Sequence, residues 1–225
     1  MAKGKRKVPG INASSTADIS FILLIFFLVV TSMNSQEGLH VMLPKKSDNN
    51  EPPPVIKPNN ILQVMINSKN KIMVTAGDMS PEVFKAKYGI EDVYDVSPDV
   101  IRKIAKDFIV NKDKLPEFPV LSNVSYTYTE YDEQTREEKA VHSLPSGKTY
   151  DIATNHVITL TTDRETSYSI YFQVANELYG AYNELRDEMA MAEYGKKFAE
   201  LDQNQKGVVN EYYKYRVYEA EPISY

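Results

Sequence analysis

The feature that most constrains this chain is a twelve-residue apolar run, Ile19 to Val30, which a single carboxylate, Asp18, directly precedes. Only Ser20 interrupts the run. As a helix it would rise roughly 18 Å, which is shorter than the hydrocarbon core of a bilayer, about 30 Å. A membrane-spanning helix would therefore have to recruit neighbouring residues. We expect a transmembrane helix over residues 14–34, with Asp18 inside the lipid.

An acid in this position is a candidate functional group. An ionised carboxylate near the centre of a bilayer costs on the order of 2.5 to 3.5 kcal/mol, so intramembrane acids usually face a partner or water. On helical spacing Ser14 and Ser15 share the face of Asp18, and Ile22 and Ile25 continue that face. We predict that Asp18 takes up and releases a proton, with these four residues forming the helix face near it.

The flanking charges predict the orientation. Four basic residues lie between positions 3 and 7, and the next one after the apolar run is Lys45. By the positive-inside rule, residues 1–13 form a cytoplasmic tail and the chain after Asn34 lies outside the cytoplasm.

A cleaved secretory signal peptide is the alternative interpretation, since it also combines a basic start with a short apolar segment. It would release a secreted binding or structural domain, for which Asp18 would be irrelevant. Against it, Thr31-Ser32-Met33 is a poor cleavage site, and a signal peptide gains nothing from a bordering acid.

The rest of the chain is long enough for one ordinary domain. Residues 35–59 are polar and proline-rich and predict a flexible linker, which leaves residues 60–225 for the domain. The chain has no cysteine, so disulfides are excluded. Its net charge of -5 and the lack of a basic stripe in the domain argue against a nucleic-acid partner.

Local patterns predict a mixed α/β domain of sheet and helix. β-Branched runs predict strands at residues 61–67 and 71–75 around a turn, and a further strand at residues 157–162. Ser97-Pro98-Asp99 predicts the start of a helix that ends near Val110.

A longer helix is expected from Ser167. Its apolar stripe, which should be buried, comprises Tyr171, Val174, Leu178, Tyr182, Leu185, Met189 and Ala192. The charged residues Glu177, Glu184, Arg186 and Glu188 are interpreted as solvated.

Two further β segments are predicted. Val124, Tyr126 and Tyr128 alternate with polar residues, and residues 139–144 could return as the second strand of a hairpin. Residues 213–218 predict a closing strand, which could lie at a sheet edge and accept a partner segment by strand addition.

The order of the N-terminal motifs resembles the ExbD/TolR family of biopolymer-transport proteins. The residues that carry this resemblance are Asn12, then Asp18, the apolar helix, and Val41-x-Leu43-Pro44 after a short polar gap. The predicted hairpin at residues 61–75 also fits the periplasmic domain of that family. So does the strand at residues 157–162 with Asp163 and Thr166-Ser167-Tyr168 after it.

The resemblance implies a single-pass protein of the inner membrane whose C-terminal domain is periplasmic. It implies a homodimer inside an ExbB-like polytopic proton-channel oligomer, which powers a TonB-like transducer for outer-membrane uptake. A TolR-like role in envelope maintenance, with possible contact to peptidoglycan, is the closest alternative. Candidate partner or ligand residues are Val41, Leu43, Pro44, Asp163 and Tyr168, although Asp163 is equally suited to capping the helix that follows it.

Two departures from the family pattern stand out. Ser14-Ser15-Thr16 replaces the Thr-Pro-Phe that the family commonly has before its aspartate. Residues 77–156 have no obvious counterpart in shorter members and are interpreted as an insert.

Patterns of enzymatic sites are missing from the sequence. His40, His142 and His156 are scattered, and neither a phosphate-binding loop nor a nucleophile elbow is present. We expect neither an enzyme nor a bound metal or cofactor.

Overall fold

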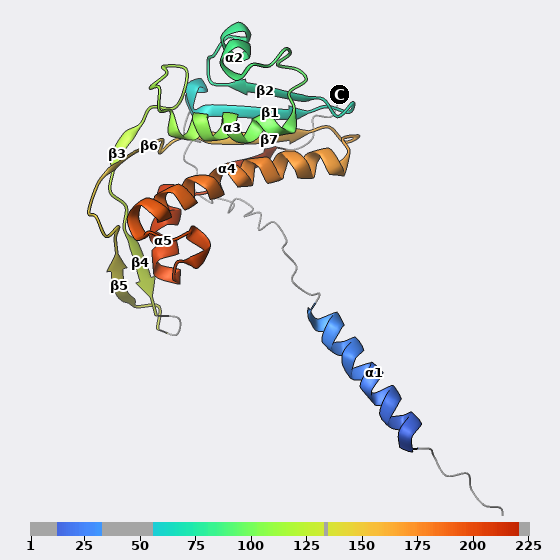
Figure 1. Ribbon diagram of the computed structural model, residues 1–225. Helices are drawn as coiled ribbons and strands as arrows, with labels where there is room; N and C mark the ends of the chain where they lie inside the picture. The colour runs from blue at the N-terminus through green and yellow to red at the C-terminus, as the bar shows by residue number, and fades with distance from the viewer. Residues whose placement is uncertain (1–12, 33–55, 133–134, 221–225) are drawn as a thin grey trace, which may run out of the picture. The chain divides into compact units, whose positions relative to one another are not determined.

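The computed structural model describes residues 13–32, 56–132 and 135–220 (Figure 1). The chain divides into two compact units, Met1–Pro52 and Pro53–Tyr225. In the first unit the apolar run forms the helix α1 (Ala13–Ser32), close to the range predicted from sequence. Residues 1–12 of the predicted tail and residues 35–55 of the predicted linker lie outside the described residues.

The second unit is built on a four-stranded sheet in the order β2-β1-β7-β8. Its strands are β1 (Ile61–Ile66), β2 (Ile72–Ala76), β7 (Val157–Thr162) and β8 (Val217–Ala220). β1 pairs with β2 in antiparallel fashion, whereas β7 runs parallel to both β1 and β8. The predicted mixed α/β class, the first hairpin and the strand at residues 157–162 are confirmed. The closing strand begins at Val217, four residues later than predicted.

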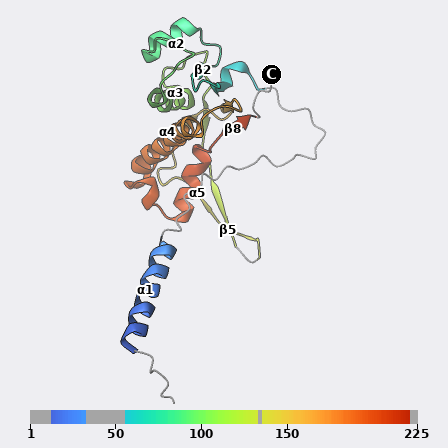
Figure 2. The same ribbon diagram turned by 90° about the vertical axis from the view of Figure 1, so that its right-hand side faces the viewer.

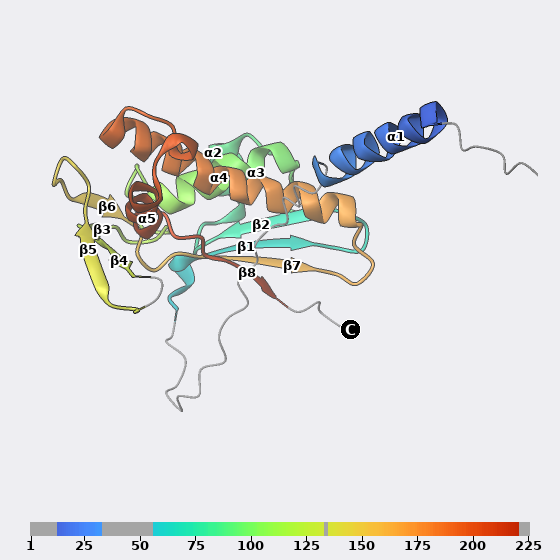
Figure 3. The same ribbon diagram turned by 90° about the horizontal axis from the view of Figure 1, so that it is seen from below.

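Helices cover one face of this sheet. Alternate strand residues such as Leu62, Val64 and Leu160 point into the core, where each is at most 2% exposed. Figure 3 shows α3 (Pro98–Val110) and α4 (Tyr168–Tyr194) on the same side of the strands. The opposite face carries half-buried and exposed residues such as Gln63 and Thr75.

The helix α3 has the predicted boundaries, because its apolar residues recur at helical spacing. Five of them, Ile101, Ile104, Ala105, Phe108 and Ile109, are buried. Ser97 occupies the N-cap position, but its side chain caps no backbone N–H and instead donates a hydrogen bond to Asp99 (3.3 Å). Asn111 ends the helix in the left-handed conformation, and its side-chain amide donates to the main-chain oxygens of Leu115 and Pro119.

The helix α4 buries most of the predicted stripe, from Val174 to Met189. Tyr171 is half-buried, and Ala192 is exposed, so its predicted burial is wrong. The reason is that the last turns of α4 leave the main core and pack into a second apolar cluster through Met189 and Ala190.

The two edges of the main sheet differ. Along β2, the connection after α2 (Pro81–Tyr88) forms two hydrogen bonds with the strand. The N–H of Val74 donates to Val93 O (3.2 Å), and the N–H of Val96 donates to Ile72 O (2.9 Å). No strand of the described residues pairs with the outer side of β8. The prediction that the closing strand lies at an edge is confirmed.

The middle of the chain forms two small antiparallel pairs. One is the expected hairpin, whose return strand lies close to the predicted residues 139–144, and the other was not expected. β3 (Ser122–Val124) pairs with β6 (Tyr150–Ile152), and β4 (Tyr128–Tyr131) pairs with β5 (Glu138–His142). The predicted continuous strand from Val124 to Tyr128 is therefore wrong. It is interrupted because the N–H of Tyr126 donates to the hydroxyl of Tyr212 (2.9 Å) and not to a neighbouring strand.

These pairs fold together with α5 (Gln203–Tyr212), a helix that the sequence patterns did not indicate to us. Figure 2 shows α5 beside the β4–β5 hairpin. A capping box between Asp202 and Gln205 starts α5, and the one-turn helix η2 (Phe198–Glu200) precedes it. The second cluster comprises Leu144, Ile152, Met189, Ala190, Leu201, Val208, Val209 and Tyr212.

Candidate functional site

Asp18, the predicted proton carrier, is an exposed residue of α1. Ser14 and Ser15 precede it within the helix by about one turn, and Ile22 and Ile25 follow it on the same face. Ile22 is 60% exposed and Ile25 is 45% exposed. The assignment of these four residues to the functional face near Asp18 stays a prediction.

Large apolar side chains surround α1 after Asp18. Eight of them, between Ile19 and Phe27, are at least 45% exposed. A helix that is apolar on all sides is ordinarily covered by protein or lipid. Within residues 13–32, 56–132 and 135–220, no helix meets the combined requirements of length and apolarity for crossing a membrane. The transmembrane assignment stays a prediction.

In the second unit, Asp163 follows the end of β7. Its N–H donates to Ile66 O (3.0 Å) and to the hydroxyl of Thr166 (3.0 Å), and that hydroxyl donates to Ile66 O (3.1 Å). These bonds tie the connection between β7 and α4 to the end of β1. The N-cap of α4 is Ser167, so Asp163 does not serve as the cap.

Asp163 lines a cleft of about 180 Å³ at the end of the sheet. Met65 and Met73, which are directly opposite one another in the β1–β2 pair, line it together with the half-exposed ring of Tyr94. The remaining lining residues are Ile66, Asn67, Lys71, Thr161 and Thr162. The cleft is therefore apolar, with polar and charged groups around it.

Charges at the cleft are unequally compensated. The ammonium of Lys71 forms an ion pair with Asp95 at 3.0 Å. Among the described residues, no ion pair or side-chain hydrogen bond involves the carboxylate of Asp163. The cleft thus presents one uncompensated negative charge.

Tyr168 does not line this cleft. It is 75% exposed at the start of α4, where its ring lies 5.9 Å from that of Tyr171 and 6.2 Å from that of Phe172. Tyr171 donates a hydrogen bond to Glu219 of β8. The aromatic group at Tyr168 therefore adjoins the open edge strand, whereas Asp163 belongs to the cleft. Val41, Leu43 and Pro44 lie outside the described residues.

Comparison with known protein families decides the affiliation of the chain. A family model described as biopolymer transport protein ExbD/TolR matches residues 4–184. The chain belongs to the ExbD/TolR family. No curated protein and no solved structure matches it.

The match covers α1 with Asp18 and the cleft with Asp163, so both candidate sites of this ExbD/TolR protein lie in the family region. It ends within α4, before α5 and β8. Residues 77–121 supply α2, α3 and core residues such as Phe84 and Phe118 to the main core. The interpretation of residues 77–156 as an insert stays a prediction.

Charged residues of α4 that the sequence suggested were solvated are in fact partnered. Arg102 of α3 contacts Glu177 (2.8 Å) and Glu184 (3.1 Å), and Lys106 contacts Glu184 and Glu188. The hydrogen bond to Glu184 raises the pKa of Arg102. The spacing of 177, 184 and 188 on one helix face was a signal for such a ladder, but its partner helix could not be read from it.

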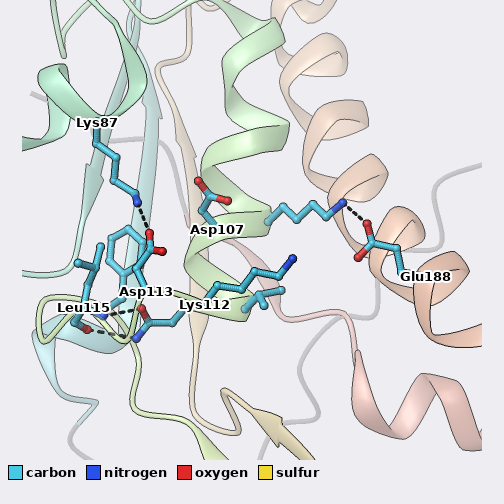
Figure 4. Close-up of a pocket in the computed structure, with 10 residues that line it drawn as sticks. Lys87, Asp107, Lys112, Asp113, Leu115 and Glu188 are labelled. Carbon is cyan, nitrogen blue, oxygen red and sulfur yellow. Dashed lines mark hydrogen bonds and ion pairs between the residues drawn. The ribbon is translucent and has the colours of Figure 1, made fainter. Parts of the chain in front are cut away.

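The ion pairs between α3 and α4 border, at Lys106 and Glu188, a small cavity of about 60 Å³ at the end of α3 (Figure 4). Lys87 points to Asp113 there (2.8 Å), and this hydrogen bond lowers the pKa of Asp113. Lys106, which also lines the cavity, donates a hydrogen bond to Glu188. Four of the charged residues that line the cavity are thus engaged in ion pairs with one another. The described residues contain no group of three His, Asp or Glu that could hold a metal ion.

Proposed function

We propose that this ExbD/TolR protein is the proton-responsive subunit of an inner-membrane energising complex, with α1 in the bilayer and Asp18 as its titrating group. The observation that supports this most directly is the composition of α1, in which exposed apolar side chains follow a single carboxyl, Asp18. Family membership, with a match that includes this helix, supports it independently and argues against a cleaved leader.

The physical basis is the solvation of a carboxyl group. A low-dielectric surrounding disfavours the charged form, so a carboxyl there takes up a proton and releases it when water returns. Moving one charge through 100 mV is worth about 2.3 kcal/mol, which biases a two-state arrangement of helices only modestly. Forceful work therefore requires several protons in each cycle.

A single helix offers no continuous polar path, so a polytopic partner has to supply the other side of it. We assign this role to an ExbB-like proton-channel oligomer around a dimer of the present chain. The second unit then lies in the periplasm and transmits motion to a TonB-like protein. The open edge of β8 and the adjoining Tyr168 offer a place where a partner segment could add as a strand.

The test is the substitution Asp18→Asn, which keeps size and polarity but removes titration. We expect it to abolish energised uptake while membrane insertion and assembly with the channel partner continue. Asp18→Glu is the matched control, because it keeps a carboxyl and should retain part of the activity. Normal transport by the Asp18→Asn protein would refute the proton role.

The client of the complex is identified by the proteins that co-purify with the full chain in detergent. A TonB-like transducer would support the uptake role. Components of a Tol-like assembly, together with retention on peptidoglycan, would establish envelope maintenance instead. N-terminal sequencing of the mature protein checks that residues before Asn34 are retained.

A further inference from the structure

The cleft around Asp163 has the size of one side chain. Its volume of about 180 Å³ falls well short of the roughly 300 to 1,000 Å³ that small-molecule sites usually occupy. A water molecule takes up roughly 30 Å³ of liquid, so the cleft would hold a handful of waters or one long side chain. A bulky ligand or cofactor is a poor fit.

The chemistry of the cleft suits a side chain that is apolar along its stem and cationic at its end. Met65 and Met73 present flexible thioethers that adapt to an alkyl stem. Tyr94, 62% exposed, offers a ring face to a cation. Asp163 offers a carboxylate without an ion-pair partner among the described residues, since Lys71 is engaged by Asp95.

Lysine and arginine are the side chains with this combination. An anionic ligand would be repelled by the negative charge of Asp163. A purely apolar ligand would bury the carboxylate without giving it a partner, which is unfavourable. We propose that the cleft formed by Met65, Met73, Tyr94 and Asp163 binds a lysine or arginine side chain of an extended segment from a partner protein.

Met65 is paired with Met73 on one side and Thr161 on the other, and all three lie on the sheet face opposite the core. Figure 3 shows α3 and α4 on the other face, so neither helix has to move for a peptide to reach these residues. Asp163 is also held in place by the bonds of its own N–H to Ile66 and Thr166. The main chain that carries the carboxylate is therefore fixed before a ligand arrives, which lowers the entropic cost of binding.

Only the identity of the partner rests on the proposed function. We take the partner to be the protein to which the complex transmits its motion. The binding itself needs neither an ion gradient nor Asp18. An Asp18→Asn protein that still binds peptide would separate the two proposals.

The experiment uses the full chain in detergent micelles with methyl-labelled methionine. The chain has 8 methionines, and Met65→Leu and Met73→Leu assign the two reporter signals. The probes are three acetylated hexapeptides in which valine alternates with lysine, glutamate or norleucine. We expect only the lysine peptide to shift both signals in a saturable way, with an affinity that falls as salt is added.

Asp163→Asn should lower the affinity for the lysine peptide about threefold or more, as expected for the loss of an exposed charge pair. Glu165→Gln, two residues away and exposed, is the matched control and should leave the affinity unchanged. Equal shifts by all three peptides, no shift by any of them, or an unchanged affinity in Asp163→Asn would each overturn the proposal. A last control replaces Lys45 and Lys46 by glutamine in the absence of peptide. If this double substitution shifted both methionine signals, a lysine of the chain itself would occupy the cleft, and the proposal would be overturned.

Discussion

The hydroxyl of Tyr182 lies 2.8 Å from Nε2 of His156, and both side chains are buried. On the other side of the ring, Nδ1 lies 2.6 Å from Ala153 O. A carbonyl oxygen can only accept, so Nδ1 carries the proton and Nε2 accepts from Tyr182. The Tyr182 oxygen in turn accepts from the N–H of Arg216 (3.3 Å). The pair joins the start of β7, the middle of α4 and the approach to β8.

This arrangement predicts an acid-sensitive fold. Burial lowers the pKa of His156 to about 4, an effect that nearby Arg216 reinforces and the hydrogen bond to Ala153 partly opposes. In the unfolded chain the ring titrates near pH 6.5, so between these values only the unfolded state binds the proton. The contribution of His156 to stability is complete above pH 6.5 and falls by about 2 kcal/mol by pH 5.

The measurement is urea unfolding of the detergent-solubilised chain at pH 7.5 and pH 5, followed by the near-UV signal of its tyrosines. His156→Gln keeps a polar side chain that does not titrate, so its loss of stability between the two pH values should be smaller by about 2 kcal/mol. Identical pH dependence in the two proteins would show that His156 is not buried as a neutral ring.

A second prediction concerns Arg186. Its Nε and Nη2 donate to Tyr213 O at 3.1 and 2.9 Å, and its guanidinium lies 6.0 and 5.8 Å from the rings of Tyr182 and Phe198. Arg186→Ala leaves that carbonyl without these donors and removes the packing, so we expect a loss of about 2 kcal/mol or more.

Arg164→Ala is the control for Arg186, because Arg164 is exposed and should change stability by less than about 0.5 kcal/mol. Thermal unfolding compares the two variants, and hydrogen exchange of the β8 amides locates the effect. We expect faster exchange in β8 for Arg186→Ala only. Equal behaviour of the two variants would contradict the assigned role.

A third prediction contrasts two helical glycines. A Cβ at Gly180 would lie 2.7 Å from guanidinium atoms of Arg102, whereas one at Gly207 would lie 2.6 Å from the ring of Tyr128. The end of Arg102 is flexible and partly exposed, so it can move aside. Gly180→Ala should therefore stay within about 0.5 kcal/mol of the original stability, since the better helix propensity of alanine, up to about 1 kcal/mol, offsets weakened surface ion pairs.

Gly207→Ala gains the same helix propensity but forces the ring of Tyr128, which packs against the second apolar cluster, to shift. Overpacking of this kind costs about 1 to 3 kcal/mol, so the net effect is destabilising. Thermal unfolding measures both variants. Limited proteolysis at residues 132–137, the connection between β4 and β5, checks that Gly207→Ala loosens the hairpin. A stabilised Gly207→Ala protein would show that α5 does not hold Tyr128 in place.

Local elements were predictable because their signals lie within a few residues. Apolar residues at helical spacing sufficed for α3 and most of α4, and β-branched runs around Asn67 sufficed for the first hairpin. Two helices were overlooked although their starting signals are present. Ser80 caps the start of α2, where Pro81 is the first residue, and Asp202 with Gln205 forms the capping box of α5.

Long-range contacts were not predictable in the same way. The strand through Tyr126 is interrupted by the hydroxyl of Tyr212, which lies 86 positions away in the chain. The charged residues of α4 looked solvated because their partners, Arg102 and Lys106, lie on another helix. For the cleft, the sequence indicated Asp163 but not Met65, Met73 or Tyr94, which the sheet and a loop bring to it.

The sequence alone determined that an acid borders an apolar helix and that a mixed α/β domain follows, because both are properties of neighbouring residues in the chain. Only the tertiary structure decided that Asp163 faces an apolar cleft, that His156 is buried against Tyr182, and that α5 completes a second core. These features depend on which parts of the chain, distant in sequence, bury their apolar surfaces against one another. That choice is made only when the whole chain packs.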